Sequence, residues 1–529
     1  MMKYMKQINI PALPAFGETE FFENRENERS AVVMIPHADS HAFSEYCRLF
    51  ESCGWEQKED RRTDTHLYAS YTDGENALFI NYFPTVRELS VVTETGCGYF
   101  SYSDRPQSTA ASAEITQLEL EDFGMSYVIR LSDGRFIVID GGRDFVPDRN
   151  RLYGCLKDQS VHEKPIIAAW ILTHPHPDHF HLFVGFMEDH ADDVVIEKFI
   201  FNFPECTDLA HYPSLADKDP RFDYDNSAPI FIPKMLEQMK KTGAPVYTAH
   251  TGQIYPIGDA VCEVLASMDD TIHSSNNINA SSLVIRMELA GQVILWAADA
   301  PFSVSKLPEK YAGYLKADIL QVPHHGFQSG TAESEIRSYK LIGPKVCLLP
   351  VSDYNAYTIF CTHKESTRFL MTKAGIGELI TGTPTRTISL PYTPPPYAAR
   401  ELECSYLSGL DRCGATAWIF TELNTAVADD FRFTILNTTT FKTTVWIELF
   451  FEDPARNIRF IKTEVPGNAM RRISVTGDSV VPDALHFNWL SLKAQGIPEN
   501  APFAARFTCE SPIVVSHRTH QASYHSPNR

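Results

Sequence analysis

The sequence predicts an α/β fold flanked by two further domains, and three observations support this prediction. Short apolar segments alternate with helical segments between about residues 117 and 392. Before residue 117 the chain has one helical segment among several strand-like segments. After residue 392 it is almost entirely strand-like. A chain of 529 residues is also too long for one hydrophobic core, since domains usually contain ~100 to 200 residues. We therefore expect three domains.

Residues 1–110 form the first predicted domain, a small α+β module. The segment AFSEYCRLFESCGW places apolar residues at helical spacing, and SAVVMIP, HLYASYT, ALFINYF and LSVVTE have the composition of strands. In PHADSH, His37, Asp39 and His41 have the spacing of metal ligands. We favour a simpler interpretation, because Asp39 and Ser40 also suit a helix cap.

Residues 111–393 form the second predicted domain, with the alternating pattern of a layered α/β fold. It lies between YSDRPQSTAASAEITQ, which resembles a linker in composition, and YTPPPYAARE, where Pro394, Pro395 and Pro396 enforce an extended connection. Residues 400–529 form the third. There the segments FRFTILN, TTVWIELFF, IRFIKTEV, MRRISV, FAARFT and PIVVSH are β-branched and aromatic, and turn residues separate them. This pattern predicts a β-sandwich.

Charge and composition exclude several classes of protein. The formal net charge of −20 argues against a general polyanion-binding surface, which needs clustered Lys and Arg. The amino terminus lacks the pattern of a secretory signal, and no apolar segment approaches the ~20 residues of a membrane helix. The eleven cysteines include no C-x-x-C pair. We therefore expect a cytoplasmic protein without membrane association.

The stretch THPHPDHFH, from Thr173 to His181, contains the strongest functional signal. It follows the apolar segment IIAAWIL and so lies at the carboxyl end of a predicted strand, where layered α/β folds commonly bind ligands. Imidazoles suit zinc, and an added carboxylate suits a second, harder site. We expect two divalent metal ions, with Zn²⁺ first and Mn or Fe as alternatives.

The spacing H-x-H-x-D-H resembles the signature of the metallo-β-lactamase superfamily. The resemblance implies an αββα fold, in which His174, His176, Asp178 and His179 bind metal. Upstream, YVIRLSDGRFIVIDGG predicts a hairpin that turns at Asp133-Gly134 and ends in a motif resembling the first motif of the family. This implies that Asp140 supports the metal-binding loop without being a ligand.

Two downstream segments extend the resemblance. SSLVIRMELAGQVILWAADA predicts a hairpin with its turn near Gly291, and its terminal Asp299 resembles the aspartate that bridges the two metals, although Ala298 stands where the family usually has glycine. LKADILQVPHHGFQSG resembles the P-H-H-G element of the competence-type branch of the superfamily. The resemblance implies that one of His324 and His325 binds metal and the other contacts substrate. We favour His325 as the ligand and His324 as the catalytic residue.

The resemblance is incomplete at two places. The superfamily normally has one more histidine between this loop and the bridging aspartate, and the candidates are His211, His250 and His273. His250 is kept as the candidate additional ligand. The alternative is that this ligand is missing, because Ser267-Met268 stands where related sequences carry it; the first site would then rest on His174, His176 and Asp299 and be weak or vacant. His181 occupies a place where glycine is commoner, and it either points into the cleft or lies at the surface.

The last domain resembles a second family, the sensory rhodopsin transducer proteins. The matching stretches are FTILNTT, VWIELFFEDP, TEVPGNAMRRISV and IPENAPFAARFTCESPIVVSHRTHQ. This resemblance implies a small β-sandwich that oligomerises and binds a partner or small ligand. Arg471, Arg472, His517 and Arg518 are candidates for such a surface. We expect a homo-oligomer through this domain.

These observations predict a metal-dependent hydrolase. A metal-bound hydroxide would attack an ester, amide or phosphodiester substrate, and Asp178 or a cleft histidine would transfer the proton. The P-H-H-G resemblance favours a phosphodiester, whereas the acidic charge disfavours it. The alternative is a metal-poor sensing or scaffolding protein that acts through its transducer-like domain.

Overall fold

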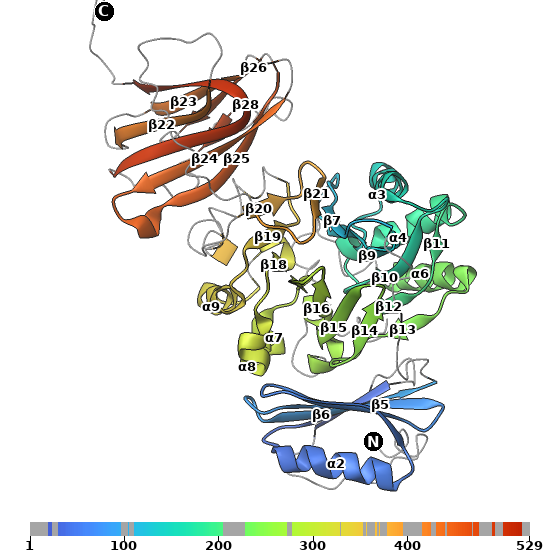
Figure 1. The fold of residues 1–529 in the computed structure, drawn as a ribbon. Helices are drawn as coiled ribbons and strands as arrows, with labels where there is room; N and C mark the ends of the chain where they lie inside the picture. The colour runs from blue at the N-terminus through green and yellow to red at the C-terminus, as the bar shows by residue number, and fades with distance from the viewer. Residues whose placement is uncertain are drawn as a thin grey trace, which may run out of the picture. The chain divides into compact units, whose positions relative to one another are not determined.

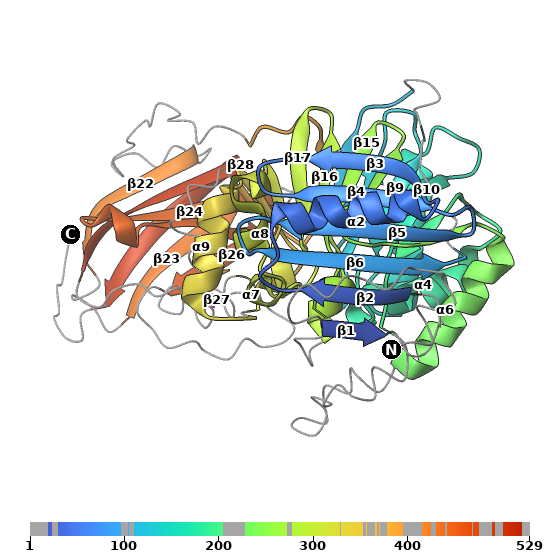
Figure 2. The ribbon, with the colours of Figure 1, turned by 90° about the horizontal axis from the view of Figure 1, so that it is seen from below.

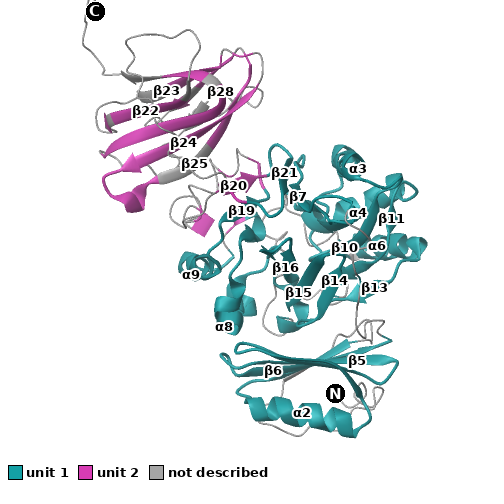
Figure 3. Ribbon diagram, in the orientation of Figure 1, with its two compact units in different colours: residues 1–325, 329–350, 382–392 teal, residues 326–328, 351–381, 393–529 magenta. Residues whose placement is uncertain are grey.

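The computed structural model describes residues 20–23, 30–96, 104, 110–204, 228–271, 278–327, 329–352, 356, 366–367, 370, 378–394, 415–424, 430–437, 439, 442–467, 469–474, 489–491 and 501–520. The chain divides into two compact units (Figure 3). The first unit comprises residues 1–325, 329–350 and 382–392, and the second comprises residues 326–328, 351–381 and 393–529.

The first unit begins with a six-stranded antiparallel sheet in the order β1-β2-β6-β5-β4-β3 (Figure 2), called here the N-terminal sheet. Helix α2 (Ser40–Ser52) packs on one face, and its N-cap Asp39 accepts a hydrogen bond from Ala42 N at 2.9 Å, which confirms the predicted cap. The predicted strands are present. The strands are β1 (Glu20–Glu23), β2 (Ser30–Ile35), β3 (Glu56–Arg62), β4 (Leu67–Thr72), β5 (Asn76–Phe83) and β6 (Glu88–Thr95).

Two further sheets form the centre of the first unit (Figure 1). One has the order β13-β12-β10-β9-β8-β7-β21, with β11 beside β10, and the other contains β14-β15-β16-β17-β18-β19 in that order. The first contains β7 (Glu114–Gln117), β8 (Ser126–Arg130), β9 (Phe136–Asp140), β10 (Ile166–Ile171), β11 (Val195–Ile196), β12 (Phe199–Phe201), β13 (Val246–Thr248) and β21 (Arg386–Ser389). The second contains β14 (Ile254–Ile257), β15 (Ala260–Ala266), β16 (Val284–Leu289), β17 (Gln292–Trp296), β18 (Ile319–Gln321) and β19 (Val346–Leu349).

Helices flank these two sheets, so the predicted α/β fold is confirmed. Helices α3 (Val146–Gln159), α4 (Pro177–His190) and α6 (Ala228–Thr242) share a hydrophobic core with the first sheet. Trp170 of β10 lies at its centre, edge-on to Phe183 and Phe186 of α4. In the second sheet, α7 (Phe302–Ser305) and α8 (Leu307–Tyr311) lie between β17 and β18 in the chain, and α9 (Ala332–Ile342) lies between β18 and β19. Among the described helices, none is both long and apolar enough to span a bilayer.

The strand order brings several loops to one edge of the two sheets. Strands β8 and β9 form the hairpin predicted at Asp133-Gly134, and β16 and β17 form the one predicted near Gly291. Gly134 and Gly291 have φ values of 81° and 76°, which glycine adopts without a steric penalty. Strand β9 then pairs in parallel with β10, and β17 with β18. Because parallel strands end at the same edge, the segments after β9 and β10 emerge together, as do those after β17 and β18.

The second unit is rich in strands, as predicted. Its main sheet has the order β25-β24-β28-β23-β26-β27, with β22 also on β28. The predicted strands FAARFT and PIVVSH are one continuous strand, because β28 runs through both and pairs with β22, β23 and β24. The strands are β20 (Glu378–Thr381), β22 (Ala415–Asn424), β23 (Asp430–Asn437), β24 (Thr443–Phe451), β25 (Ile458–Val465), β26 (Ala469–Ser474), β27 (Trp489–Ser491) and β28 (Pro502–His520).

Candidate metal centre

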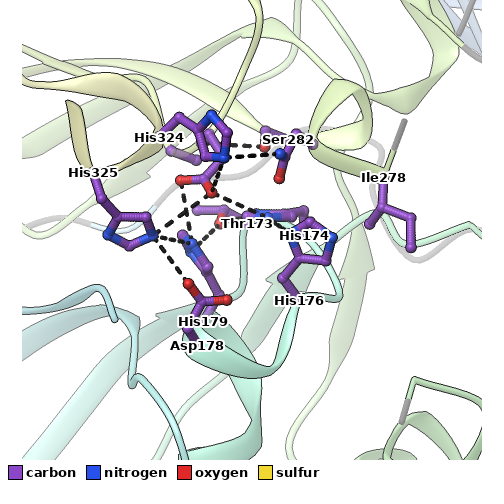
Figure 4. A network of polar contacts seen from close by, with 12 residues as sticks. Thr173, His174, His176, Asp178, His179, Ile278, Ser282, His324 and His325 are labelled. Atoms are coloured by element: carbon purple, nitrogen blue, oxygen red, sulfur yellow. Dashed lines mark hydrogen bonds and ion pairs between the residues drawn. The ribbon is translucent and has the colours of Figure 1, made fainter. Parts of the chain in front are cut away.

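Two groups of buried side chains have the composition of metal sites (Figure 4). In each group, three ligand atoms lie within 4.8 Å of one another. The first triad is His174, His176 and Asp299, and the second triad is Asp178, His179 and His325. All six residues were predicted from the sequence as metal ligands, and the structure brings them together.

The two triads are adjacent. His179 Nε2 of the second triad lies 3.2 Å from Asp299 Oδ1, and His174 Nε2 of the first lies 3.8 Å from Asp299 Oδ2. Within the second triad, His325 Nε2 lies 3.2 Å from Asp178 Oδ2. Asp299 therefore stands between the triads, where a carboxylate that bridges two ions would lie.

The loop after β10 has a simple local cause for its geometry. Helix α4 begins at Pro177, whose fixed φ suits the first helical position. This start leaves His174 and His176 in the extended loop and places Asp178 and His179 in the first helical turn. The two histidines at alternate positions of the loop, His174 and His176, therefore belong to the first triad. Asp178 and His179, in the first turn of the helix, belong to the second triad.

Asp140 belongs to neither triad and holds the loop from behind. Its carboxylate accepts hydrogen bonds from Thr173 N and Thr173 Oγ1, both at 2.7 Å, and from His179 Nδ1 at 2.7 Å. Since the carboxylate can only accept, His179 must donate its Nδ1 proton, and its Nε2 atom faces the metal centre. The geometry thus fits the supporting role expected for Asp140.

His324 and His325 differ in their environment. The His325 ring is buried and donates its Nδ1 proton to the Pro350 carbonyl at 3.2 Å, so its Nε2 atom faces Asp178 and His179. The His324 side chain is 26% exposed. Its Nδ1 atom lies 2.6 Å from Ser329 Oγ, and its Nε2 atom lies 3.2 Å from Asn279 Nδ2. This geometry fits the expectation that His325 is the ligand, while His324 lies closer to solvent.

A buried amide that the sequence analysis missed shapes the loop of Asp299. Gln321 Oε1, at the end of β18, accepts hydrogen bonds from Ala297 N at 2.9 Å and Ala298 N at 2.6 Å. Gln321 Nε2 donates to the carbonyls of Ala298 and Val322. The only signal in the sequence was a polar residue inside the apolar segment ADILQVP.

Four residues at the metal centre have a strained backbone. Asp140, Ala298, His324 and His325 have φ values of 55°, 47°, 51° and 52°, which non-glycine residues rarely adopt. Such conformations persist only where the surrounding structure enforces them, and they cluster at functional sites. The Gln321 amide supplies this constraint at Ala298, where the superfamily usually has glycine.

His250 is not brought to either triad. Its Nδ1 atom lies 2.7 Å from Asp269 Oδ2, and its Nε2 atom lies 3.0 Å from Glu94 Oε2. Both ring nitrogens are therefore engaged by carboxylates, which leaves neither for a metal ion. His211 and His273 lie outside the described residues. Ser267, at the position where the family ligand was expected, caps the turn that follows β15.

His181 is buried rather than at the surface, so one of the two alternatives for it is wrong. Its ring stacks on Phe231 of α6, with 3.7 Å between the ring centroids. Burial lowers the pKa of His181 to about 3, so the ring is neutral at physiological pH. The stacked ring explains why a large residue is accommodated where glycine is commoner.

The side chains of the two triads fit divalent cations. Asp178 Oδ1 is buried and forms no hydrogen bond within the described part of the chain. Burial opposes a charge on His179, but the Asp299 and Asp140 carboxylates outweigh it and raise the pKa of His179 well above its usual value. The centre therefore attracts positive charge, and metal ions could replace that proton.

Comparison with known proteins agrees with this geometry. Residues 120–237 match the model of the metallo-beta-lactamase superfamily. The chain carries a metallo-beta-lactamase domain. The matched stretch contains Asp140 and the whole loop from His174 to His179. Asp299 and His325 lie beyond the matched stretch, so their place in the two triads rests on the contacts described above.

Several solved structures are similar to parts of the chain. A metallo hydrolase from the archaeon Ignicoccus hospitalis is 14% identical, with 54% of this chain and 100% of that chain covered and a TM-score of 0.30. The diiron β-hydroxylase CmlA from Streptomyces venezuelae is 12% identical, with 53% and 55% covered and a TM-score of 0.32. The Anabaena sensory rhodopsin transducer is 24% identical, with 20% and 96% covered and a TM-score of 0.15. No curated protein matches the chain.

Proposed function

We propose that the chain is a metal-dependent hydrolase whose two triads hold two divalent ions, with Zn²⁺ as the expected metal. The observation that carries this proposal is the pair of adjacent, buried triads that share the Asp299 carboxylate. Bound ions of this kind act as Lewis acids and lower the pKa of a coordinated water. Four histidines and two carboxylates match the ligand preference of zinc and related metals.

The protein supplies positioning and proton transfer. Asp178 Oδ2 contacts His325, while its Oδ1 atom is buried and has no hydrogen bond among the described residues. We propose Asp178 as the residue that transfers the proton. His324 lies at the more exposed side of the centre and is held through both ring nitrogens by Ser329 and Asn279. We propose that His324 contacts the substrate there, beside the ions and not as a ligand.

The substrate proposal covers an ester, an amide or a phosphodiester, all of which present an electrophilic centre to an activated water. The test is metal analysis of the purified protein, followed by hydrolysis assays with a generic member of each class. We expect two metal ions per chain and hydrolysis of at least one substrate. His176→Ala and Asp299→Ala should each abolish turnover, because each removes a donor of the first triad.

A matched control is His41→Ala, which removes an exposed histidine of α2 and should leave turnover unchanged. A protein that binds no metal, and instead binds a partner through residues after Tyr397, would favour the sensing or scaffolding alternative. One observation favours this alternative. Ser267, which caps the turn after β15, stands where a further ligand for the first triad was expected. The homo-oligomer expected through residues 400–529 is a separate proposal, which light scattering of the purified protein tests.

A further inference from the structure

Strand β6 of the N-terminal sheet carries two carboxylates that contact buried cations of the metallo-beta-lactamase domain. Near its end, Glu94 Oε2 lies 3.0 Å from His250 Nε2. At its start, Glu88 Oε1 lies 2.8 Å from Lys310 Nζ of α8. The His250 and Lys310 side chains are both almost fully buried. The proposed reaction uses none of these four residues.

Both cations contact the same short segment on their other side. His250 Nδ1 lies 2.7 Å from Asp269 Oδ2, and Lys310 Nζ lies 2.7 Å from Asp270 Oδ1. Asp269 and Asp270 belong to the turn Ser267–Thr271 that follows β15, called here the capped turn. Two carboxylate–cation–carboxylate bridges therefore connect β6 to the capped turn.

The charges in these bridges depend on one another. Each nitrogen of His250 faces an acceptor, so the ring must carry both protons. Burial opposes this charge, but Asp269 and Glu94 outweigh it and raise the pKa of His250 to about 10. Asp269 Oδ1 is buried and has no hydrogen bond among the described residues. Removing one charge from such a buried bridge leaves its partners uncompensated, which is strongly destabilising.

The capped turn continues into the metal centre through hydrogen bonds. Thr271 Oγ1 donates to the Ala280 carbonyl at 2.6 Å, within the segment Ile278–Ser282. From that segment, Asn279 Nδ2 lies 3.2 Å from His324 Nε2. Ser282 Oγ accepts a hydrogen bond from Asp299 N at 3.3 Å. The capped turn is thus connected to the metal centre in two steps. Thr271 contacts the segment that contains Asn279 and Ser282, and these two residues contact His324 and Asp299.

The N-terminal sheet also packs closely beside these bridges. Gly252, in the loop after His250, has a φ of 91°, and a Cβ atom there would lie 2.2 Å from the Tyr68 ring of β4. The Phe79 ring of β5 lies 5.0 Å from the His250 ring, centroid to centroid. The sheet therefore covers His250 closely enough to exclude an added methyl group at Gly252.

We propose that Glu88 and Glu94 are positioning residues of the metal centre. They act through Lys310 and His250 on the capped turn, which in turn orders Asn279, Ser282 and the loop of Asp299. The N-terminal sheet is then an integral part of the catalytic unit. This inference rests on the proposed function for its metal ions.

The experiment compares the full-length Glu88→Gln and Glu94→Gln variants with the wild type. Zn²⁺ affinity is measured by competition with a chromophoric chelator, well below the melting temperature of each variant. We expect each variant to lose affinity at the lower end of the ~10- to 100-fold range seen for residues that orient metal ligands. Hydrogen exchange should become faster in peptides covering Ser267–Thr271 and Ile278–Ser282.

Glu56→Gln is the matched control, because Glu56 lies in the same sheet but, within the part of the chain that the structure describes, its side chain forms only an exposed ion pair with Lys58. It should change neither measurement. The proposal is overturned if Glu88→Gln and Glu94→Gln lower only the melting temperature, with Zn²⁺ affinity and exchange as in the wild type. A wild type that binds no Zn²⁺ would instead overturn the proposed function, and the exchange data would then decide by themselves whether β6 orders the capped turn.

Discussion

The Nε2 atoms of His179 and His325 lie 3.2 Å apart in a fully buried environment. His179 donates its Nδ1 proton to Asp140, and His325 donates its own to the Pro350 carbonyl. In the neutral rings, the two Nε2 lone pairs therefore point toward the same small volume, together with Asp178 Oδ2. Two lone pairs and a carboxylate repel one another unless a proton or a metal cation lies between them, which is why we interpret this contact as part of a metal site.

Asp140→Asn should weaken binding of the ion at the second triad by ~10- to 100-fold. The amide can present its NH₂ group to His179 Nδ1, which would favour the tautomer with the proton on Nε2 and block the ligand atom. Chelator competition with Zn²⁺ measures the loss. Asp189→Asn, which alters an exposed ion pair on α4, serves as the control, and equal affinities for both variants would contradict the supporting role of Asp140.

Substitution of the two adjacent histidines should have different effects. His325→Ala removes a donor of the second triad and should reduce the metal content from two ions to about one per chain. His324→Ala should keep both ions and reduce turnover by ~10²- to 10³-fold, the range typical of removing one hydrogen-bond donor to the reacting substrate. Metal analysis and steady-state kinetics of the same preparations distinguish them. The reverse pattern would exchange the two roles.

Gln321→Leu should lower the free energy of unfolding of the metal-free protein by roughly 2–4 kcal/mol. The substitution leaves the Ala297 and Ala298 amides buried without acceptors, and each unsatisfied group costs ~1 to 3 kcal/mol. Urea denaturation measures the effect. Lys240→Leu, at an exposed position of α6, should change the stability by less than ~0.5 kcal/mol, so a similar loss in both variants would argue against this explanation.

His250 should make the stability depend on pH in the alkaline range. Its pKa rises from about 6.5 in the unfolded chain to about 10 in the folded protein, because Asp269 and Glu94 outweigh burial. The folded protein therefore holds a proton that the unfolded chain has lost. The contribution of His250 is fully present below about pH 6.5 and decreases up to about pH 10, by at most ~1.4 kcal/mol per pH unit.

Chemical denaturation at intervals from pH 6 to pH 10 measures this dependence. Glu94→Gln removes one of the two carboxylates, so the decrease should end at a lower pH than in the wild type. Groups that titrate equally in both proteins cancel in the difference between the two curves. Parallel curves would show that His250 is not the charged link between β6 and the capped turn.

Local sequence patterns were sufficient for most of the fold. The hairpins at Asp133-Gly134 and near Gly291 were predicted because alternating apolar residues and turn glycines act over a few positions. Strand β3 was not predicted, because EQKEDRR contains no apolar residue and its place at the sheet edge is decided by its pairing with β4. The continuity of β28 was likewise decided by the strands beside it, since its sequence contains a central proline.

The sequence by itself determined which residues could form the metal centre, because ligand chemistry is a property of side-chain type and H-x-H-x-D-H places four donors within six positions. Only the tertiary structure decided how they divide into two triads, that His325 faces the second triad, and that His250 is engaged elsewhere. Glu94 and His250, for example, are 156 positions apart in the sequence. Such contacts depend on how whole sheets pack, and no local pattern records that packing.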